Sequence, residues 1–337
     1  MSRFRGNHPK EEDSSRPKAD LDLHNRRTHV IISSLDLYHK LNMKDDDPID
    51  FIANLLRYCV HFNQIYCQLF KKNQITGVRE IHILDIMSRF FVRFRENISR
   101  VICDNDRREM LTSGDRKFEI LRHDLRMMVK DCPHGRAPAI YHMSEDMTTW
   151  AQQFQIPAFN QLLMPHQSEF PRFHDWSKFI LEKFMHKKIE LPRYLLRELL
   201  KPSPPGDVSE NLLRLREEVH SKKSNGENYG VIQNSVGMWM GILHYTSSHY
   251  HLALISFLEE VFERVVARCF GEHILGDIRH SAYVSSDDRY RVLVVFNESD
   301  DVSHSRTSEK VLELYETVAD HTNRLFNVKL SSKSATG

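Results

Sequence analysis

The apolar positions between residues 48 and 103 recur at steps of three or four, the spacing that places side chains on one face of a helix. In the first segment these positions are Phe51, Leu55, Cys59, Phe62, Tyr66 and Phe70. In the second segment they are Ile83, Met87, Phe90, Phe94, Ile98 and Ile102. Asn73 and Gly77 bracket the connection. The pattern therefore predicts two long helices that form an antiparallel pair.

Helical spacing continues along most of the chain. Further helices are predicted at 30–41, 118–129, 144–154, 157–163, 176–184, 208–220 and 307–326, with a buried central helix within 231–274. A strand covered on at least one face is predicted from Tyr290 to Asn297, where every second residue is apolar. Residues 283–285 can pair with it across the turn Ser286-Asp287-Asp288. The predicted fold is mainly α, a multi-helix layered array with a small β-hairpin near the C-terminus.

Breaks in the pattern suggest how the chain is divided. Residues 1–28 are almost devoid of apolar side chains, which predicts a disordered polar tail. Residues 29–200 form the expected helical domain. Prolines, serines and polar residues at 201–229 predict a linker that contains one solvated helix. Residues 230–330 make a helical subdomain with the β-hairpin, and 331–337 a disordered end.

The amino-acid composition indicates a globular protein but does not indicate its function. Of the 337 residues, 40% are hydrophobic and 28% charged, with a formal net charge of +1 that gives no overall attraction to nucleic acid or membranes. The five cysteines are odd in number and lie at no zinc-ligand spacing, which favours reduced thiols in an intracellular protein. No secretory signal or membrane-spanning run is visible. We expect a cytoplasmic or nuclear protein that does not contact membrane.

Candidate reaction chemistry is sparse. His244, His249 and His251 form the densest group of histidines, but no carboxylate stands at a spacing that would complete a metal site. A single Glu-x-x-His at 217–220 lacks the second copy that a di-iron bundle needs. Cys132 and His134 are too close in sequence to be arranged readily as a nucleophile and base. The sequence therefore predicts no catalytic residues, no metal site and no cofactor.

An arginine-rich stretch between residues 79 and 136 is the main candidate for nucleic-acid contact. Its candidate residues are Arg89, Arg93, Arg95, Arg100, Arg122 and Arg126. Arginines interleaved with phenylalanines suit phosphate contact and base stacking. However, nearly as many acidic residues lie in the same stretch, so a salt-bridged, solvated helix face is favoured over an RNA-binding surface.

The leading hypothesis is a non-catalytic adaptor or scaffold subunit, not an enzyme, that binds a protein partner through an apolar helical groove. It rests on the many large apolar residues, among them three tryptophans and 19 phenylalanines, and on the missing catalytic motifs. One alternative is an RNA-binding component that uses the arginine-rich helices around 89–126. A second is a metal-dependent hydrolase. The oligomeric state is left open.

Overall fold

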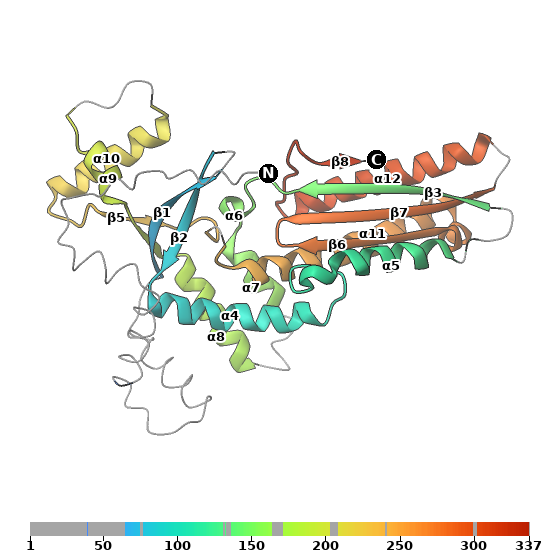
Figure 1. Cartoon of the computed structure of the whole chain (residues 1–337), viewed down its shortest axis with the longest axis horizontal. Helices are drawn as coiled ribbons and strands as arrows, with labels where there is room; N and C mark the ends of the chain where they lie inside the picture. Colours follow the sequence, from blue (N-terminus) through green and yellow to red (C-terminus); the bar gives the residue numbers. More distant parts are fainter. Residues whose placement is uncertain are drawn as a thin grey trace, which may run out of the picture. The chain divides into compact units, whose positions relative to one another are not determined.

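The computed structural model describes residues 39, 65–74, 77–130, 132, 136–163, 171–202, 208–239, 241–298 and 302–336. The chain divides into two compact units, Met1–Asn63 and Gln64–Gly337. The predicted tail at 1–28, most of the predicted helix at 30–41 and the start of the segment at 51–70 lie outside the described residues, as do residues 203–207 of the predicted linker. The helices and strands of the second unit are drawn in colour in Figure 1.

The first sheet replaces part of the predicted helix pair. It contains β1 (Tyr66–Gln74), β2 (Gly77–Leu84), β4 (Lys187–Glu190) and β5 (Val231–Asn234), in the order β2-β1-β4-β5. β1 and β2 are antiparallel strands, and Gln74 pairs with Gly77 at their connection. The predicted antiparallel helix pair is therefore wrong. Tyr66 and Phe70 are four residues apart, a spacing that also places both on one face of a strand.

The second sheet is larger than the predicted hairpin. Its strands are β3 (Arg136–Asp146), β6 (Ile278–Ser285), β7 (Asp288–Glu298) and β8 (Ala335–Thr336), in the order β6-β7-β3-β8. The hairpin of β6 and β7 confirms one prediction. The helix predicted at 144–154 is wrong, because β3 continues to Asp146 and only the short α6 (Trp150–Gln153) is helical. With two four-stranded sheets, the fold is mixed α/β and not mainly α.

Most of the other predicted helices are confirmed. They are α5 (Lys117–Lys130), α7 (Ile156–Leu163), α8 (Pro171–Phe184), α10 (Glu210–Ser224), α11 (His244–Phe270) and α12 (Val302–Leu325). The second half of the early pattern forms α4 (Ile86–Asp104), where the Asp85 carboxylate accepts the N–H of Ser88 at 2.9 Å as an N-terminal cap. α9 (Arg193–Leu199) and two 3₁₀ turns, Gly114–Arg116 and Glu272–Asp277, complete the described elements.

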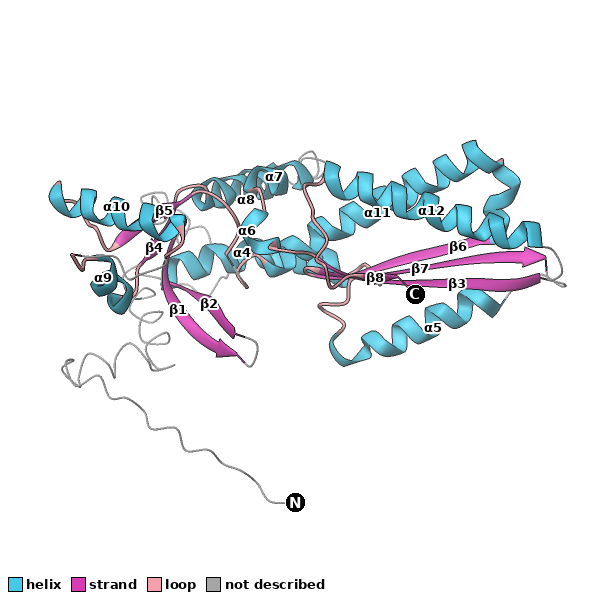
Figure 2. Cartoon of the chain, turned by 90° about the horizontal axis from the view of Figure 1, so that it is seen from above, coloured by secondary structure: helices cyan, strands magenta, loops and turns pink. Residues whose placement is uncertain are grey.

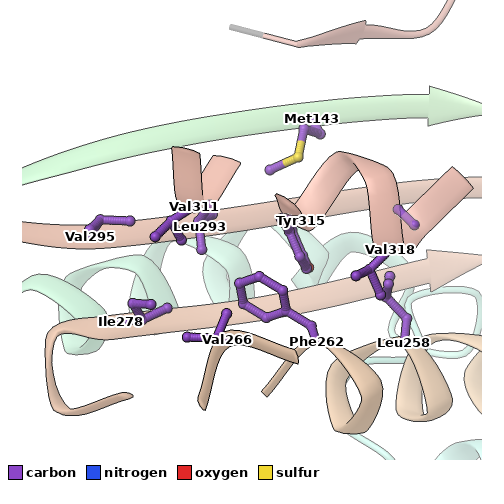
Figure 3. Packing of buried hydrophobic residues seen from close by; sticks show 11 residues of the cluster. Met143, Leu258, Phe262, Val266, Ile278, Leu293, Val295, Val311, Tyr315 and Val318 are labelled. Atoms are coloured by element: carbon purple, nitrogen blue, oxygen red, sulfur yellow. The ribbon is translucent and has the colours of Figure 1, made fainter. Parts of the chain in front are cut away.

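Helices cover both faces of the second sheet (Figure 2). α11 and α12 pack on one face, where a buried cluster joins Met143, Leu258, Phe262, Val266, Ile278, Leu293, Val295, Val311, Tyr315, Val318 and Ala319 (Figure 3). α5 packs on the opposite face, against Val292, Val294 and Phe296 of β7. β7 is therefore covered on both faces, as a strand in the interior of a sheet with helices on both sides is.

Candidate functional site

Three aspartates come together where β3 and β7 end. Asp146 is the last residue of β3 and lies directly opposite Asp288, the first residue of β7. Side chains of directly opposed residues share one face of a sheet, with Cβ atoms about 5 Å apart. Asp287 precedes Asp288 in the hairpin turn, and its carbonyl oxygen accepts the N–H of Met147 at 3.2 Å. Two segments 140 residues apart in sequence thus supply one acidic cluster.

Repulsion from the neighbouring aspartates contributes to the pKa of Asp288. The pKa of Asp288 is raised, first by partial burial and then by the negative charges of Asp287 and Asp146, while Lys117 at the start of α5 acts in the opposite direction. Asp288 is exposed, and Asp146 and Asp287 are partly exposed. The cluster is therefore an accessible concentration of negative charge that a bound cation would relieve.

The donor set of this cluster suits a hard divalent cation. Carboxylate oxygens are the ligands that Mg²⁺ prefers, and Mg²⁺ is commonly held by one or two protein carboxylates together with waters and substrate phosphates. Among the described residues, no group of three or more His, Cys, Asp or Glu side chains is placed so that it could hold a metal ion by itself. Asp146, Asp287 and Asp288 supply carboxylate oxygens of the kind that Mg²⁺ binds when waters and substrate phosphates complete its coordination.

A buried ion network lies on the other face of the same strand ends. Glu145 pairs with Arg289 across the strands, and its Oε2 accepts Arg289 Nε at 2.6 Å and Arg291 Nε at 2.9 Å. Its Oε1 accepts Arg291 Nη2 at 2.7 Å. Despite burial, the two guanidinium groups lower the pKa of Glu145 to about 2. The network fixes the register that places Asp146 opposite Asp288.

The start of α11 reaches the same region. Glu96 of α4 caps this helix, because its carboxylate accepts the backbone N–H groups of Tyr245 at 2.8 Å and Thr246 at 3.0 Å. One turn later, the Ser248 hydroxyl donates to the buried carboxylate of Glu109 at 2.5 Å. These contacts hold the first turns of α11 beside the hairpin turn that contains Asp287.

A tight glycine contact holds the segment that follows Asp146. Gly237 has φ 72°, and a Cβ at this position would lie 2.7 Å from the carbonyl oxygen of Ala151 in α6. The N–H of Met238 donates to that same oxygen at 2.8 Å. Residue 237 therefore has to be glycine for the loop before α11 to bind α6 this closely.

The C-terminal residues run alongside Asp146 on its other side. The backbone N–H of Asp146 donates to Ser334 Oγ at 3.2 Å, and the N–H of Ser331 donates to the carbonyl oxygen of Asp146 at 2.7 Å. Lys329 and Lys333 of this segment are exposed. These two lysines are therefore sequence neighbours of the serines that contact Asp146.

Five of the six predicted nucleic-acid residues are exposed, on α4 and α5. Arg89 and Arg93 of α4 are exposed and line a cavity of about 270 Å³ together with His244 and Tyr245. Arg100 is exposed on the same helix, with its guanidinium 5.6 Å from the ring centre of Tyr245. Arg122 and Arg126 are exposed on α5.

Arg95 differs from the other five arginines because it points into the interior. It is fully buried, and its Nη1 donates to Ser99 Oγ at 2.6 Å. Burial lowers the pKa of its guanidinium to about 10. Arg95 therefore belongs to the core of the α4–α11 contact and cannot reach a ligand on the surface.

The histidines that drew attention in the sequence are structural neighbours of the acidic turn. His244 Nδ1 lies 3.0 Å from Ser286 Oγ, and His251 Nδ1 lies 2.9 Å from the Ser286 carbonyl oxygen. His249 Nδ1 lies 3.4 Å from Ser99 Oγ on α4. His244 and His251 both contact Ser286, at its hydroxyl and at its carbonyl oxygen, whereas His249 contacts Ser99 on another helix, so the three rings do not share one centre.

Sequence reasoning missed the three clustered aspartates. Asp287 and Asp288 look like ordinary turn residues between two strands, and Asp146 sits in a stretch with helical spacing. The sequence signal at this place is a pair of consecutive aspartates, of which Asp287 lies in the two-residue turn and Asp288 begins β7. Aspartate is common in turns, so the pair by itself does not distinguish a binding site from an ordinary turn.

Comparison with known proteins identifies what this chain resembles. A family model described as bunyavirus RNA dependent RNA polymerase matches residues 32–337. The chain is 27% identical over 252 residues to the RNA-directed RNA polymerase L of Rice stripe virus (isolate T), which covers 69% of this chain and 8% of that protein. It is 29% identical over 231 residues to the same protein of Uukuniemi virus (strain S23), covering 65% and 10%.

A more distant relative extends the match along the chain. The RNA-directed RNA polymerase L of Junin mammarenavirus is 25% identical over 316 residues, which cover 87% of this chain and 13% of that protein. The chain thus spans roughly a tenth of the length of these curated relatives.

Proposed function

The chain belongs to the bunyavirus RNA-dependent RNA polymerase family, and from this premise we propose that it carries the site at which nucleotides are joined on an RNA template. The observation that supports the proposal most directly is the convergence of Asp146, Asp287 and Asp288 at the ends of β3 and β7. Nucleotide addition is a phosphoryl transfer, and polymerases carry it out with divalent cations held by carboxylates.

The family membership corrects two expectations drawn from the sequence. The hypothesis of a non-catalytic adaptor or scaffold is wrong, and so is the expectation that the protein is not an enzyme, because the matched family and the relatives are RNA-directed RNA polymerases. The physical reason for the error is that the acidic cluster is assembled from residues far apart in sequence. No short motif with fixed spacing was available to reveal it.

Asp146, Asp287 and Asp288 would hold the divalent cations. Bound there, Mg²⁺ or Mn²⁺ neutralises charge that develops on the transferred phosphoryl group and activates the attacking hydroxyl. The chain's own part is to hold Asp146 opposite Asp288 at the ends of the two strands. The Glu145–Arg289–Arg291 network supports this from the opposite face of the sheet, because it joins β3 to β7 in the same register.

RNA contact is proposed for the exposed arginines of α4. Arg89 and Arg93 line a cavity that also reaches His244, and His244 contacts Ser286 in the acidic turn. Guanidinium groups bind phosphate through paired hydrogen bonds, so these two residues suit an RNA backbone that passes the acidic cluster. Within the described residues, no helix has the length and apolar content to cross a membrane.

The experiment that tests the proposed function is primer extension on an RNA template with Asp288→Asn. Removing a carboxylate from the cluster should lower the rate of nucleotide addition about 100-fold or more. Asp320→Asn is the matched control, because Asp320 is exposed on α12 and pairs with Arg324 away from the acidic cluster. Equal activity of the wild-type protein and the Asp288 variant would contradict the proposal.

A further inference from the structure

Ser286 occupies an unusual place in the acidic hairpin. It has φ 61°, in the left-handed region that favours glycine, and it is only 2% exposed. For a residue with a side chain this conformation costs about 1 kcal/mol, so neighbouring contacts have to hold it. Asp287 and Asp288 follow directly, so whatever holds Ser286 also sets the direction of both carboxylates.

One face of α11 supplies those contacts. The N–H of Ser286 donates to Ser248 Oγ at 3.3 Å, and Ser286 Oγ lies 3.0 Å from His244 Nδ1. The carbonyl oxygen of Ser286 accepts a hydrogen bond from His251 Nδ1 at 2.9 Å. Residues 244, 248 and 251 follow one another at steps of four and three, so they lie on a single helical face. The backbone and side chain of Ser286 are therefore both bound by this helix.

His251 also contacts the segment that carries the third aspartate. Its ring centre lies 5.0 Å from that of Trp150, with an angle of 35° between the ring planes. Trp150 stands four residues after Asp146 and is 7% exposed, while His251 is completely buried. A single side chain of α11 thus contacts both segments that supply the acidic cluster.

The protonation state of His251 suits a residue that holds its neighbours in place. A carbonyl oxygen can only accept a hydrogen bond, so Nδ1 carries the proton. Burial, followed by the charge of Arg289, lowers the pKa of the ring to about 3, which keeps it neutral at neutral pH. Nε2 is buried and has no hydrogen-bond partner among the described residues. The ring therefore has no route along which to pass a proton to a substrate.

We propose that His251 is a positioning residue for nucleotide addition: its Nδ1–H holds the Ser286 carbonyl and its ring holds Trp150, which together set the spacing between Asp287–Asp288 and Asp146. This inference rests on the proposed function, because it assumes that the three aspartates bind the catalytic cations. It goes beyond that function by assigning a residue of α11, outside the cluster, to the geometry of the site.

Two substitutions of His251 distinguish loss of the Nδ1 hydrogen bond from loss of the buried ring. His251→Asn keeps an N–H donor close to the position of Nδ1, whereas His251→Gln moves its donor toward the position of Nε2. His249→Asn is the matched control, since His249 is a buried histidine of the same helix, 6% exposed, that lies beside Ser99 of α4. The first measurement is a Mn²⁺ titration of the full chain, followed by the signal of free Mn²⁺ in electron paramagnetic resonance.

His251→Gln should weaken Mn²⁺ binding about ten-fold or more, as is typical when a group that orients metal ligands is lost. In single-nucleotide extension it should lower kcat more than it raises KM for the nucleotide, because the nucleotide's own contacts remain. His251→Asn should restore most of the Mn²⁺ affinity, and His249→Asn should leave it unchanged. Wild-type affinity in the folded Gln variant would overturn the inference, as would equal losses in the Gln and Asn variants or a similar loss in the His249 variant.

Failure of this inference can be told apart from failure of the proposed function. If Asp288→Asn abolishes Mn²⁺ binding while His251→Gln leaves it unchanged, only the role of His251 is refuted. If the wild-type protein shows no Mn²⁺ site that depends on Asp288, the proposed function itself fails. Should the Gln variant not fold, Trp150→Phe tests the same link through the other contact. It should weaken Mn²⁺ binding in the same direction, and unchanged affinity would overturn the inference.

Discussion

Replacing Glu145 with glutamine is a direct test of the buried network behind the acidic cluster. Glu145 is 5% exposed and makes three hydrogen bonds with the guanidinium groups of Arg289 and Arg291, which are also buried. The substitution keeps the size of the side chain and removes its charge. Two buried cations would then face each other without a counter-ion, an arrangement that is strongly destabilising in proteins.

The expected magnitude follows from the pKa of Glu145, which falls from an ordinary value of 4.5 to about 2 in the folded protein. Because the folded pKa is the lower one, the stabilisation is complete above pH 4.5 and is lost as the pH falls toward 2. A difference of this size corresponds to about 3 kcal/mol at neutral pH. Loss of one partner of a buried ion pair commonly costs about 3 to 5 kcal/mol, which agrees with this value.

Urea unfolding at a series of pH values measures the effect. At pH 7 the Glu145→Gln variant should be less stable by about 3 kcal/mol. The gap should narrow as the pH falls from 5 toward 3, because Glu145 becomes protonated in the unfolded wild-type chain while it is still ionised in the folded protein. Glu260→Gln is the control, since Glu260 pairs with Arg264 on an exposed face of α11 and should change stability by less than about 1 kcal/mol. Equal stability of the wild-type and Glu145 variant at pH 7, or a gap that does not change with pH, would refute the reasoning.

Three further predictions concern the surroundings of the cluster. Gly237→Ala should lower the free energy of unfolding by at least about 2 kcal/mol in urea titrations, because the new Cβ would lie 2.7 Å from a carbonyl oxygen. Gly226→Ala is the control: Gly226 has φ 71° and no neighbour within 4 Å, so the substitution should lower the free energy of unfolding by only about 1 kcal/mol. Glu96→Gln should speed amide hydrogen exchange in the first turn of α11 and cost about 1 kcal/mol, because the cap loses its charge; unchanged exchange would contradict it. Replacing Arg89 and Arg93 together with glutamine should weaken RNA binding. It should also reduce by about 2 the slope of the logarithm of the binding constant against the logarithm of the salt concentration, measured by fluorescence anisotropy. An unchanged slope would show that neither guanidinium contacts phosphate.

The sequence by itself determined the elements whose periodicity is long and uniform. α5 was predicted within one residue at each end, α8 and α12 were predicted with starts five residues too late, and α11 was predicted as a helix within 231–274. A long apolar stripe at helical spacing identifies the element, although it does not fix its first residue. The β6–β7 hairpin was also predicted, since a short run rich in β-branched and aromatic residues beside a turn of Ser and Asp is typical of a strand. The exposed arginines of α4 were likewise visible as candidates, although the burial of Arg95 was not.

Tertiary structure decided the strands that lack a clear period and the site itself. β1 carries aromatic residues four positions apart, a spacing shared by helix and strand, and only pairing with β2 and β4 selects the strand. The acidic cluster depends on one register, Asp146 opposite Asp288, between strands 140 residues apart in sequence. Hydrogen bonding between strands and the buried contacts of Glu145 set that register, and neither acts between neighbours in the chain. Local patterns cannot reveal such a site, because its geometry arises only when the distant segments pair.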